Sequence, residues 1–208
     1  MKFLIVDDHA IVRKGLSQLL KEEFASAEVE EVSDSSEVYG KIKSKVWDVI
    51  LLDISMPGRN GLDILKQLRS DNIKAPVLML SMHPEDQYAL RVLKAGANGF
   101  LNKETANEEL IAAVHKVLAG RKYISAALAE KLADGAGGGT EKPGHELLSD
   151  REMQVLQLIA SGKTVSEIAE AILLSVNTIS TYRNRILEKL SLHNNAELTR
   201  YALENGLV

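Results

Sequence analysis

Hydrophobic residues in the first 120 positions alternate between short continuous runs and helically spaced stripes. The runs predict five strands, at Lys2–Val6, Glu28–Val32, Asp48–Leu52, Ala75–Ser81 and Gly99–Leu101. The stripes predict five amphipathic helices, at Ala10–Lys21, Ser35–Lys43, Gly61–Ser70, Glu85–Ala95 and Ala106–Leu118. This alternation indicates an α/β domain, a doubly wound parallel sheet of five strands joined by right-handed crossovers and covered on both faces.

The helical stripes also name the side chains that should face the core. The first helix presents Ile11, Leu16, Leu19 and Leu20 at helical spacing, and the fifth presents Leu110, Val114 and Val117. The third strand carries four consecutive aliphatic residues, the pattern of a strand buried on both faces. We therefore expect this strand at the centre of the sheet.

The last 60 residues have a different, purely helical pattern. Ser149 and Glu152 form a capping box that starts a helix ending at Ala160. Further helices are predicted at Thr164–Ile172, Asn177–Leu190 and Asn195–Asn205. Two short helices joined by a tight turn describe a helix-turn-helix. The last helix carries Leu198, Tyr201 and Ala202, which serve either as a dimer seam or as the core of the four-helix unit.

A segment without apolar periodicity separates the two patterns. Ser125–Ala133 predicts a short helix, and Asp134–Gly144 holds five glycines in eleven residues, a composition typical of a flexible tether. We therefore expect a first domain at 1–120, a linker at 121–146 and a second, all-α domain at 147–208.

Composition limits the classes of protein that fit. The 208 residues carry a net charge of −4 and no cysteine, so a disulfide framework is excluded and DNA binding would need a local basic patch. No apolar run approaches the roughly 20 residues of a membrane span, and the first apolar run is too short for a secretory signal. The five histidines show no metal-ligand spacing. We expect a cytoplasmic protein without membrane contact.

Polar residues follow four of the predicted strands. Asp7 and Asp8 end the first strand, Asp53 the third and Ser81 the fourth, while Lys103 follows the fifth. The carboxyl ends of parallel strands meet at one edge of the sheet, where α/β proteins bind ligands. Three converging carboxylates need a cation, and oxygen ligands favour Mg²⁺. The sequence therefore predicts a phosphoryl-transfer pocket with Asp53 as nucleophile and Ser81 and Lys103 as partners of the phosphoryl oxygens.

Residues 1–120 resemble a response-regulator receiver domain. The resemblance is carried by the acidic pair Asp7-Asp8, the acceptor run Leu51–Gly58, the hydroxyl of Ser81 and Lys103 after the fifth strand. It implies that a partner histidine kinase phosphorylates Asp53. It also implies that Phe100 is a switch aromatic, which turns inward when Ser81 is drawn to the phosphoryl group.

Residues 147–208 resemble a LuxR-type DNA-binding domain, so the whole chain resembles the NarL/FixJ-type response regulators. The resemblance is carried by Leu148–Glu152, Ile159–Lys163 and Leu174–Ile179. It implies binding of a double-stranded DNA operator by a homodimer that forms on phosphorylation. The residues that it places at the DNA are Thr178, Ser180, Thr181, Tyr182, Arg183, Asn184, Arg185 and Lys189. Ser180 and Tyr182 depart from the family's usual Lys and His, so the individual base contacts stay open.

Three other functions compete with this interpretation. A Mg²⁺-dependent phosphatase would also use Asp53 as nucleophile, but it would carry a second aspartate where this chain has Ser55. A nucleotide-binding module would need a glycine-rich turn after Val6, where the chain has Asp7-Asp8-His9. A regulator that binds DNA without phosphorylation stays possible, although the complete acidic set argues against it.

Overall fold

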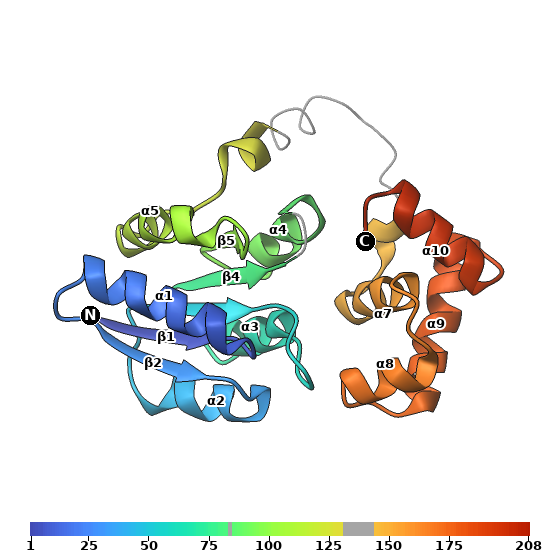
Figure 1. The fold of residues 1–208 in the computed structure, drawn as a ribbon, viewed down its shortest axis with the longest axis horizontal. Coiled ribbons are helices and arrows are strands. Elements are labelled where there is room, and N and C mark those ends of the chain that lie inside the picture. Colours follow the sequence, from blue (N-terminus) through green and yellow to red (C-terminus); the bar gives the residue numbers. More distant parts are fainter. Residues whose placement is uncertain (83–84, 131–143) are drawn as a thin grey trace. The chain divides into compact units, whose positions relative to one another are not determined.

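A computed structural model describes residues 1–82, 85–130 and 144–208, and contacts divide the chain into two compact units, Met1–Ala136 and Gly137–Val208 (Figure 1). The predicted glycine-rich tether lies almost entirely outside the described residues, as does His83, one of the five histidines. Of the predicted helix at Ser125–Ala133, residues 126–130 are described and are helical.

The first unit contains the predicted five-stranded parallel sheet. Its strands are β1 (Lys2–Val6), β2 (Glu28–Val32), β3 (Val49–Asp53), β4 (Val77–Ser81) and β5 (Gly99–Asn102). Their order is β2-β1-β3-β4-β5, and every neighbouring pair is parallel. The α/β doubly wound class is therefore confirmed, with β3 at the centre.

Five helices connect and cover these strands. They are α1 (Ala10–Glu23), α2 (Ser35–Ser44), α3 (Gly61–Ser70), α4 (Glu85–Lys94) and α5 (Ala106–Leu118). The side chains of Asp34 and Asn60 cap α2 and α3 by accepting hydrogen bonds from Ser36 N and Leu62 N. The predicted bounds agree with these to within two residues at each helix end.

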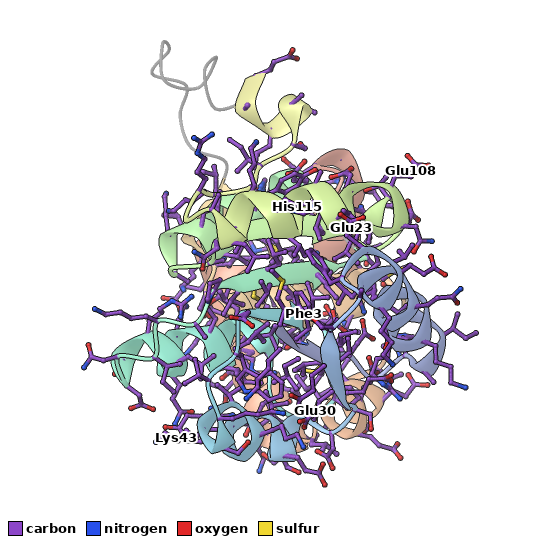
Figure 2. All side chains as sticks on the ribbon, turned by 90° about the vertical axis from the view of Figure 1, so that its left-hand side faces the viewer. Phe3, Glu23, Glu30, Lys43, Glu108 and His115 are labelled. Carbon is purple, nitrogen blue, oxygen red and sulfur yellow. The ribbon has the colours of Figure 1, made fainter. Side chains whose placement is uncertain are left out.

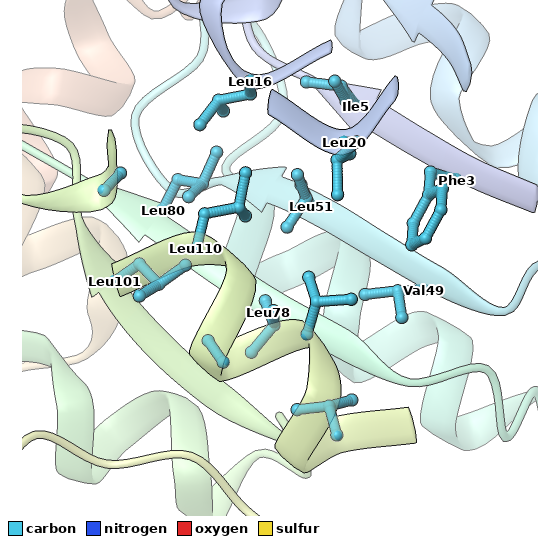
Figure 3. Close-up of a cluster of buried hydrophobic side chains, with 14 residues drawn as sticks. Phe3, Ile5, Leu16, Leu20, Val49, Leu51, Leu78, Leu80, Leu101 and Leu110 are labelled. Atoms are coloured by element: carbon cyan, nitrogen blue, oxygen red, sulfur yellow. The ribbon is translucent and has the colours of Figure 1, made fainter. Parts of the chain in front are cut away.

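One side of the sheet packs against α1 and α5. Phe3, Leu51 and Leu80 from the strands meet Leu20 of α1 and Leu110 of α5 in one continuous buried cluster (Figure 3). At the surface of the same pair of helices, His115 Nε2 lies 2.8 Å from Glu23 Oε1 (Figure 2). The remaining helices, α2 to α4, lie on the opposite face of the sheet (Figure 1).

The prediction that Ile11 faces the core is wrong. Its side chain is 88% exposed, while Leu16 and Leu20 are buried and Leu19 is partly buried. Ile11 stands in the first turn of α1, five residues before Leu16, the first buried residue of that helix. Helical spacing identifies the apolar stripe but not which of its members are covered by other elements.

Two strands begin later than predicted. The backbone N–H of Asp48 bonds Lys2 O outside the ladder, so β3 starts at Val49 and includes Asp53. Pro76 has no N–H to donate, and β4 starts at Val77, whose N–H bonds the side chain of Asn98. The carboxylate of Asp53 therefore belongs to the last residue of the central strand.

The second unit is helical throughout its described part. Its elements are η1 (Gly144–Leu147), α7 (Asp150–Ala160), α8 (Val165–Ala171), α9 (Val176–Leu190) and α10 (Asn195–Glu204). Capping boxes start α7 at Ser149 and α8 at Thr164, each with a glutamate three residues later. The turn between α8 and α9 holds Leu173 at φ 53°, with its side chain 71% exposed. The helix-turn-helix predicted from the sequence is present.

Leu198 and Ala202 of α10 belong to the core of this unit. Both are completely buried in the single chain, and Leu207 folds back beside them, with Gln157 of α7 donating to its carbonyl oxygen. These two side chains are therefore unavailable as a dimer seam, and the core-packing alternative holds for them. Across the described residues, no helix is long and apolar enough to cross a membrane.

Candidate phosphorylation site and DNA-facing helix

The register of the sheet brings the predicted pocket residues together. Val6 pairs with Leu52, so Asp7 and Asp53 follow on adjacent strands at the same height. On the other side of β3, Asp53 pairs with Leu80, and Ser81 is the next residue. The backbone N–H of Lys103 donates to Ser81 O at 2.8 Å. Four residues far apart in sequence thus gather at one edge.

The carboxylates form a cluster suited to a cation. Ligand atoms of Asp7, Asp8, His9 and Asp53 lie within 4.8 Å of one another. Asp7 and Asp53 are completely buried, and Asp8 is partly exposed. Among the described residues, one oxygen of each aspartate is buried and accepts no well-directed hydrogen bond, although each of these oxygens lies 2.7–2.9 Å from a nitrogen of Lys103 or His9. Three carboxylates converge here against the single ammonium of Lys103, so negative charge remains uncompensated and the donor set fits a hard divalent ion such as Mg²⁺.

Lys103 supplies a positive charge to the same pocket. Its ammonium lies 2.7 Å from Asp7 Oδ2 and 2.8 Å from Asp53 Oδ2, and the side chain is only 2% exposed. These two oxygens are among those without a well-directed hydrogen bond, so the contact is mainly electrostatic. Lys103 therefore offsets part of the repulsion between two buried carboxylates.

The environment of the pocket raises the pKa of Asp53. Burial raises the pKa of its carboxyl to about 6, the nearby charge of Asp7 adds to this, and Lys103 and the N–H of Ser55 oppose it. Ionisation of Asp53 in this pocket therefore costs free energy relative to ionisation in water. A bound cation would lower that cost.

His9 and Arg13 hold the acidic pair in place. The backbone N–H of His9 donates to Asp7 Oδ1 at 2.8 Å, and His9 Nδ1 lies 3.0 Å from the same oxygen and 2.9 Å from Asp8 Oδ1. Arg13 donates to the carbonyl oxygen of Asp7 at 2.7 Å. Asp7 therefore points one oxygen at its own loop and the other into the pocket.

Ser81 and Phe100 lie on neighbouring strands in the interior. Ser81 is completely buried, Phe100 is 1% exposed, and Phe100 pairs in register with Met79, two residues before Ser81. Phe100 is therefore in an inward position.

The loop after Asp53 depends on two residues that sequence reasoning missed. Ser35 Oγ donates to Pro57 O at 2.6 Å and accepts from the N–H of Arg59 at 3.1 Å, which fixes the turn to the start of α2. Gly61 begins α3 against the backbone of Asp53, since a Cβ there would lie 1.9 Å from Asp53 O. The only sequence signal was the Gly61 helix start, because no local pattern shows that Ser35 reaches this loop.

The second unit presents an exposed polar face on α9. Ile179 and Ile186, seven residues apart, are completely buried and anchor one side of the helix. The other side exposes Thr181, Asn184 and Arg185. The predicted residues Thr178, Ser180, Tyr182 and Arg183 are half-buried beside this face. Such a face is what a recognition helix presents to the major groove.

Two of the predicted DNA contacts have partners within the unit. Arg183 Nε donates to the side chain of Asn195, at the start of α10. Lys189 Nζ lies 2.6 Å from Glu152 Oε2, and Glu152 is 3% exposed. Lys189 and the capping hydrogen bonds of Ser149 lower the pKa of the Glu152 carboxyl, although burial opposes the shift. The Lys189 side chain therefore has a structural role, because it joins α9 to α7.

Comparison with known proteins agrees with both halves of this description. Residues 3–115 match the response regulator receiver domain, and residues 146–202 match the bacterial regulatory proteins of the luxR family. The chain is 34% identical over 206 residues to response regulator UvrY of Escherichia coli K12, covering 98% of this chain and 94% of UvrY. It is 33% identical to response regulator GacA of Pseudomonas syringae, covering 100% and 98%.

Solved structures lead to the same class. RcsB from Salmonella enterica serovar Typhimurium, bound to promoter rprA in the presence of phosphomimetic BeF₃⁻, is similar with a TM-score of 0.69 and 27% identity over 97% of both chains. The fold and the acidic pocket define a receiver domain joined to a helix-turn-helix domain. The chain belongs to the response regulators of the NarL/FixJ type, which are transcription regulators with a LuxR-type DNA-binding domain.

Proposed function

We propose that this protein regulates transcription through phosphorylation of Asp53, which controls operator binding by α9. The observation that carries the proposal is the cluster of Asp7, Asp8 and Asp53 within 4.8 Å, with the Lys103 ammonium against two of the three carboxylates. The family membership of both units supports it.

The phosphoryl donor is a phosphohistidine on a partner histidine kinase. A carboxylate oxygen of Asp53 attacks phosphorus, the P–N bond breaks, and its electron pair returns to the imidazole of the kinase. The product is an acyl phosphate on Asp53. Lys103 neutralises charge that develops on the phosphoryl oxygens, and the Ser81 hydroxyl donates a hydrogen bond to one of them.

Asp7, Asp8 and Asp53 are the residues that would hold the metal ion. Mg²⁺ prefers carboxylate oxygens and retains several waters, and when bound it neutralises negative charge on the phosphoryl group. The excess of three carboxylates over the single ammonium of Lys103 supports this assignment. Asp7 and Asp8 position the ion, while only Asp53 forms the covalent bond.

The receiver assists its own phosphorylation and dephosphorylation and turns over no other substrate. Ser55 stands two residues after the acceptor, where a phosphatase of this chemistry would carry a general acid. The same pocket therefore receives the group and loses it slowly to water.

Ser81 and Phe100 transmit the change to the surface of the receiver. When the Ser81 hydroxyl turns to the phosphoryl group, Phe100 occupies the space that it leaves. Both side chains are already buried at adjacent strands, so small movements of one affect the other. The altered surface favours a homodimer.

The dimer binds a double-stranded operator through two copies of α9. Thr181, Asn184 and Arg185 are the exposed side chains on the recognition face and contact base edges or phosphates. Thr178, Ser180, Tyr182 and Arg183 border that face. Lys189 contributes to DNA binding mainly by positioning the helix, because its ammonium is paired with Glu152.

The domain bounds and location of the protein follow from the same interpretation. The receiver occupies 1–120, a linker 121–146 and the DNA-binding domain 147–208. The proposed partners, a histidine kinase and operator DNA, support a cytoplasmic location.

The deciding experiment treats the full chain with acetyl phosphate and Mg²⁺ and measures intact mass and affinity for a pool of randomised duplexes. We expect the wild type to gain one phosphoryl group, to dimerise and to bind selected duplexes more tightly. Asp53→Ala should gain none of these. Asp71→Ala, an exposed aspartate at the end of α3, is the matched control and should respond as the wild type does.

Two outcomes would contradict the proposal. If the phosphorylated and unmodified forms bind the same duplexes equally well, the regulator acts without phosphorylation. If Asp53→Ala still gains the group, the acceptor is another residue.

A further inference from the structure

A second cavity lies at the opposite edge of the receiver sheet from Asp53. It has a volume of about 610 Å³ and is formed by the end of α2, the segment before β3 and the segment before β4. Ligand sites in proteins typically measure about 300–1,000 Å³. The size is therefore that of a small-molecule site.

The lining of this cavity is apolar with a cationic rim. Ile42 and Trp47 form a floor that is almost completely buried, and Val46 stands at the lip with 84% of its surface exposed. Lys43 and Lys74 lie at the rim, and the lining contains no acidic residue. Such a surface suits a molecule with an apolar body and a negatively charged end.

The lysines around the cavity differ in whether they form ion pairs. Lys45 pairs with Glu28 and Glu30 of β2 and lies over the Trp47 ring, 4.5 Å from its centroid. Glu28 and Glu30 are thus already paired with lysines, and Asp71, which lies near Lys43, accepts a hydrogen bond from the Tyr39 hydroxyl. Lys43 lies 4.6 Å from the centroid of the Tyr39 ring, at the periphery of α2 (Figure 2). Lys74 is exposed, with no ion pair among the described residues.

We propose that this cavity binds a small amphipathic carboxylate, with its chain against Val46 and Pro76 above the buried Trp47 and its carboxylate between Lys43 and Lys74. A cation would be repelled by the rim. An uncharged chain would gain only the contact with the floor. The site gives the receiver a ligand input separate from the pocket at Asp53.

The chain contains a single tryptophan, Trp47, so its fluorescence reports directly on the cavity. We would titrate the full-length protein with decanoate, 1-decanol and decyltrimethylammonium, each below its micellar concentration. A saturable fluorescence change is expected with decanoate. Decanol should bind at least about ten-fold more weakly, and the cation should produce no saturable change.

Variants at the rim and lip of the cavity distinguish specific binding of decanoate from its nonspecific partition into apolar parts of the protein. Lys74→Glu and Val46→Glu both alter exposed residues, and each should weaken decanoate binding by about five-fold or more. Lys21→Gln removes an exposed charge on α1, which packs on the other face of the sheet, and should leave the affinity unchanged. All three variants should unfold at temperatures close to that of the wild type.

Three results would overturn the proposal. The first is an equal response to decanoate and decanol, which would indicate simple partition. The second is an absence of saturable change with any of the probes. The third is a concentration-dependent dimer of the unmodified protein that Val46→Glu abolishes, which would mean that a second copy of the chain covers the cavity. None of these results depends on phosphorylation of Asp53.

Discussion

A Cβ atom on Gly61 would lie 1.9 Å from the carbonyl oxygen of Asp53. No side chain fits at this distance, so the first turn of α3 packs directly on the backbone at the end of β3. The N–H of Gly61 also donates to Ile54 O at 2.9 Å. The geometry of the loop after Asp53 therefore depends on Gly61, a residue that has no side chain.

Gly61→Ala should displace this loop. We expect a loss of about 2 kcal/mol or more in unfolding free energy, because backbone must move to admit the methyl group. Chemical denaturation measures the loss, and the rate of labelling by acetyl phosphate should fall with it. Gly15→Ala in α1 is the matched control, since a Cβ there meets nothing within 4 Å, and it should be neutral or stabilising. Equal effects of both variants would contradict this account.

Asp53→Asn should stabilise the protein above pH 6 in the absence of divalent cations. Burial raises the pKa of Asp53 from 3.8 to about 6, so the folded wild type binds this proton more tightly than the unfolded chain. The Asp53 carboxyl therefore makes its full contribution to the unfolding free energy below about pH 4, and this contribution is lost as the pH rises through about 6. Asparagine has no such dependence, so the gain should reach about 3 kcal/mol at pH 7 and disappear at pH 4.

Urea denaturation of both forms across this pH range, in the presence of a chelator, measures the difference. Addition of Mg²⁺ at pH 7 should stabilise the wild type and reduce or reverse the gap. A variant that is less stable than the wild type at pH 7 without metal would show that Lys103 outweighs burial in the pocket.

Lys189→Met should weaken the second unit more than it alters DNA contact. Removal of the ammonium leaves the nearly buried carboxylate of Glu152 without its charged partner, at a cost of about 1–3 kcal/mol. The pKa of Glu152 is lowered in the folded protein. The ionised carboxylate therefore stabilises the fold above 4.5, the pKa in the unfolded chain, and this stabilisation is lost as the pH falls through the lower pKa of the folded protein. The destabilisation should therefore shrink in acid.

Glu152→Gln combined with Lys189→Met should recover part of the loss, since no unpaired charge is then left buried. Arg185→Met is the matched comparison on the exposed face of α9, and it should reduce DNA affinity with little change in stability. Thermal unfolding and duplex binding, measured on all variants, distinguish the two roles. A stable Lys189→Met protein with weakened DNA binding would assign Lys189 to the DNA surface.

Leu173→Gly should stabilise the helix-turn-helix. Leu173 has a φ of 53° in the turn before α9, a conformation that costs an L-residue about 1–2 kcal/mol, and its side chain is 71% exposed. Glycine relieves that strain but loses more backbone entropy on folding, so the expected net gain is about 0.5–1 kcal/mol. Leu173→Ala keeps the strained backbone and should bring no gain. Differential scanning calorimetry of the full chain measures both.

The sequence alone determined the order of elements, because strands and helices have periodicities that are local properties of the chain. The five strands, the capping box at Ser149 and the acids at the strand ends were all predictable in this way, whereas the capping box at Thr164 was recognised only in the structure. The convergence of Asp7 and Asp53 was also predictable, since parallel strands align their carboxyl ends.

Only the tertiary structure decided what each side chain contacts across the fold. Four features depend on how separate elements pack. They are the exposure of Ile11, the hydrogen bond of Ser35 to the loop after Asp53, the ion pair of Lys189 with Glu152 and the cavity beside Trp47. Helical or strand spacing specifies which face a residue occupies, whereas the partner on that face comes from a distant part of the chain. Burial and charge pairing are therefore settled by packing, for the physical reason that they are properties of pairs of elements.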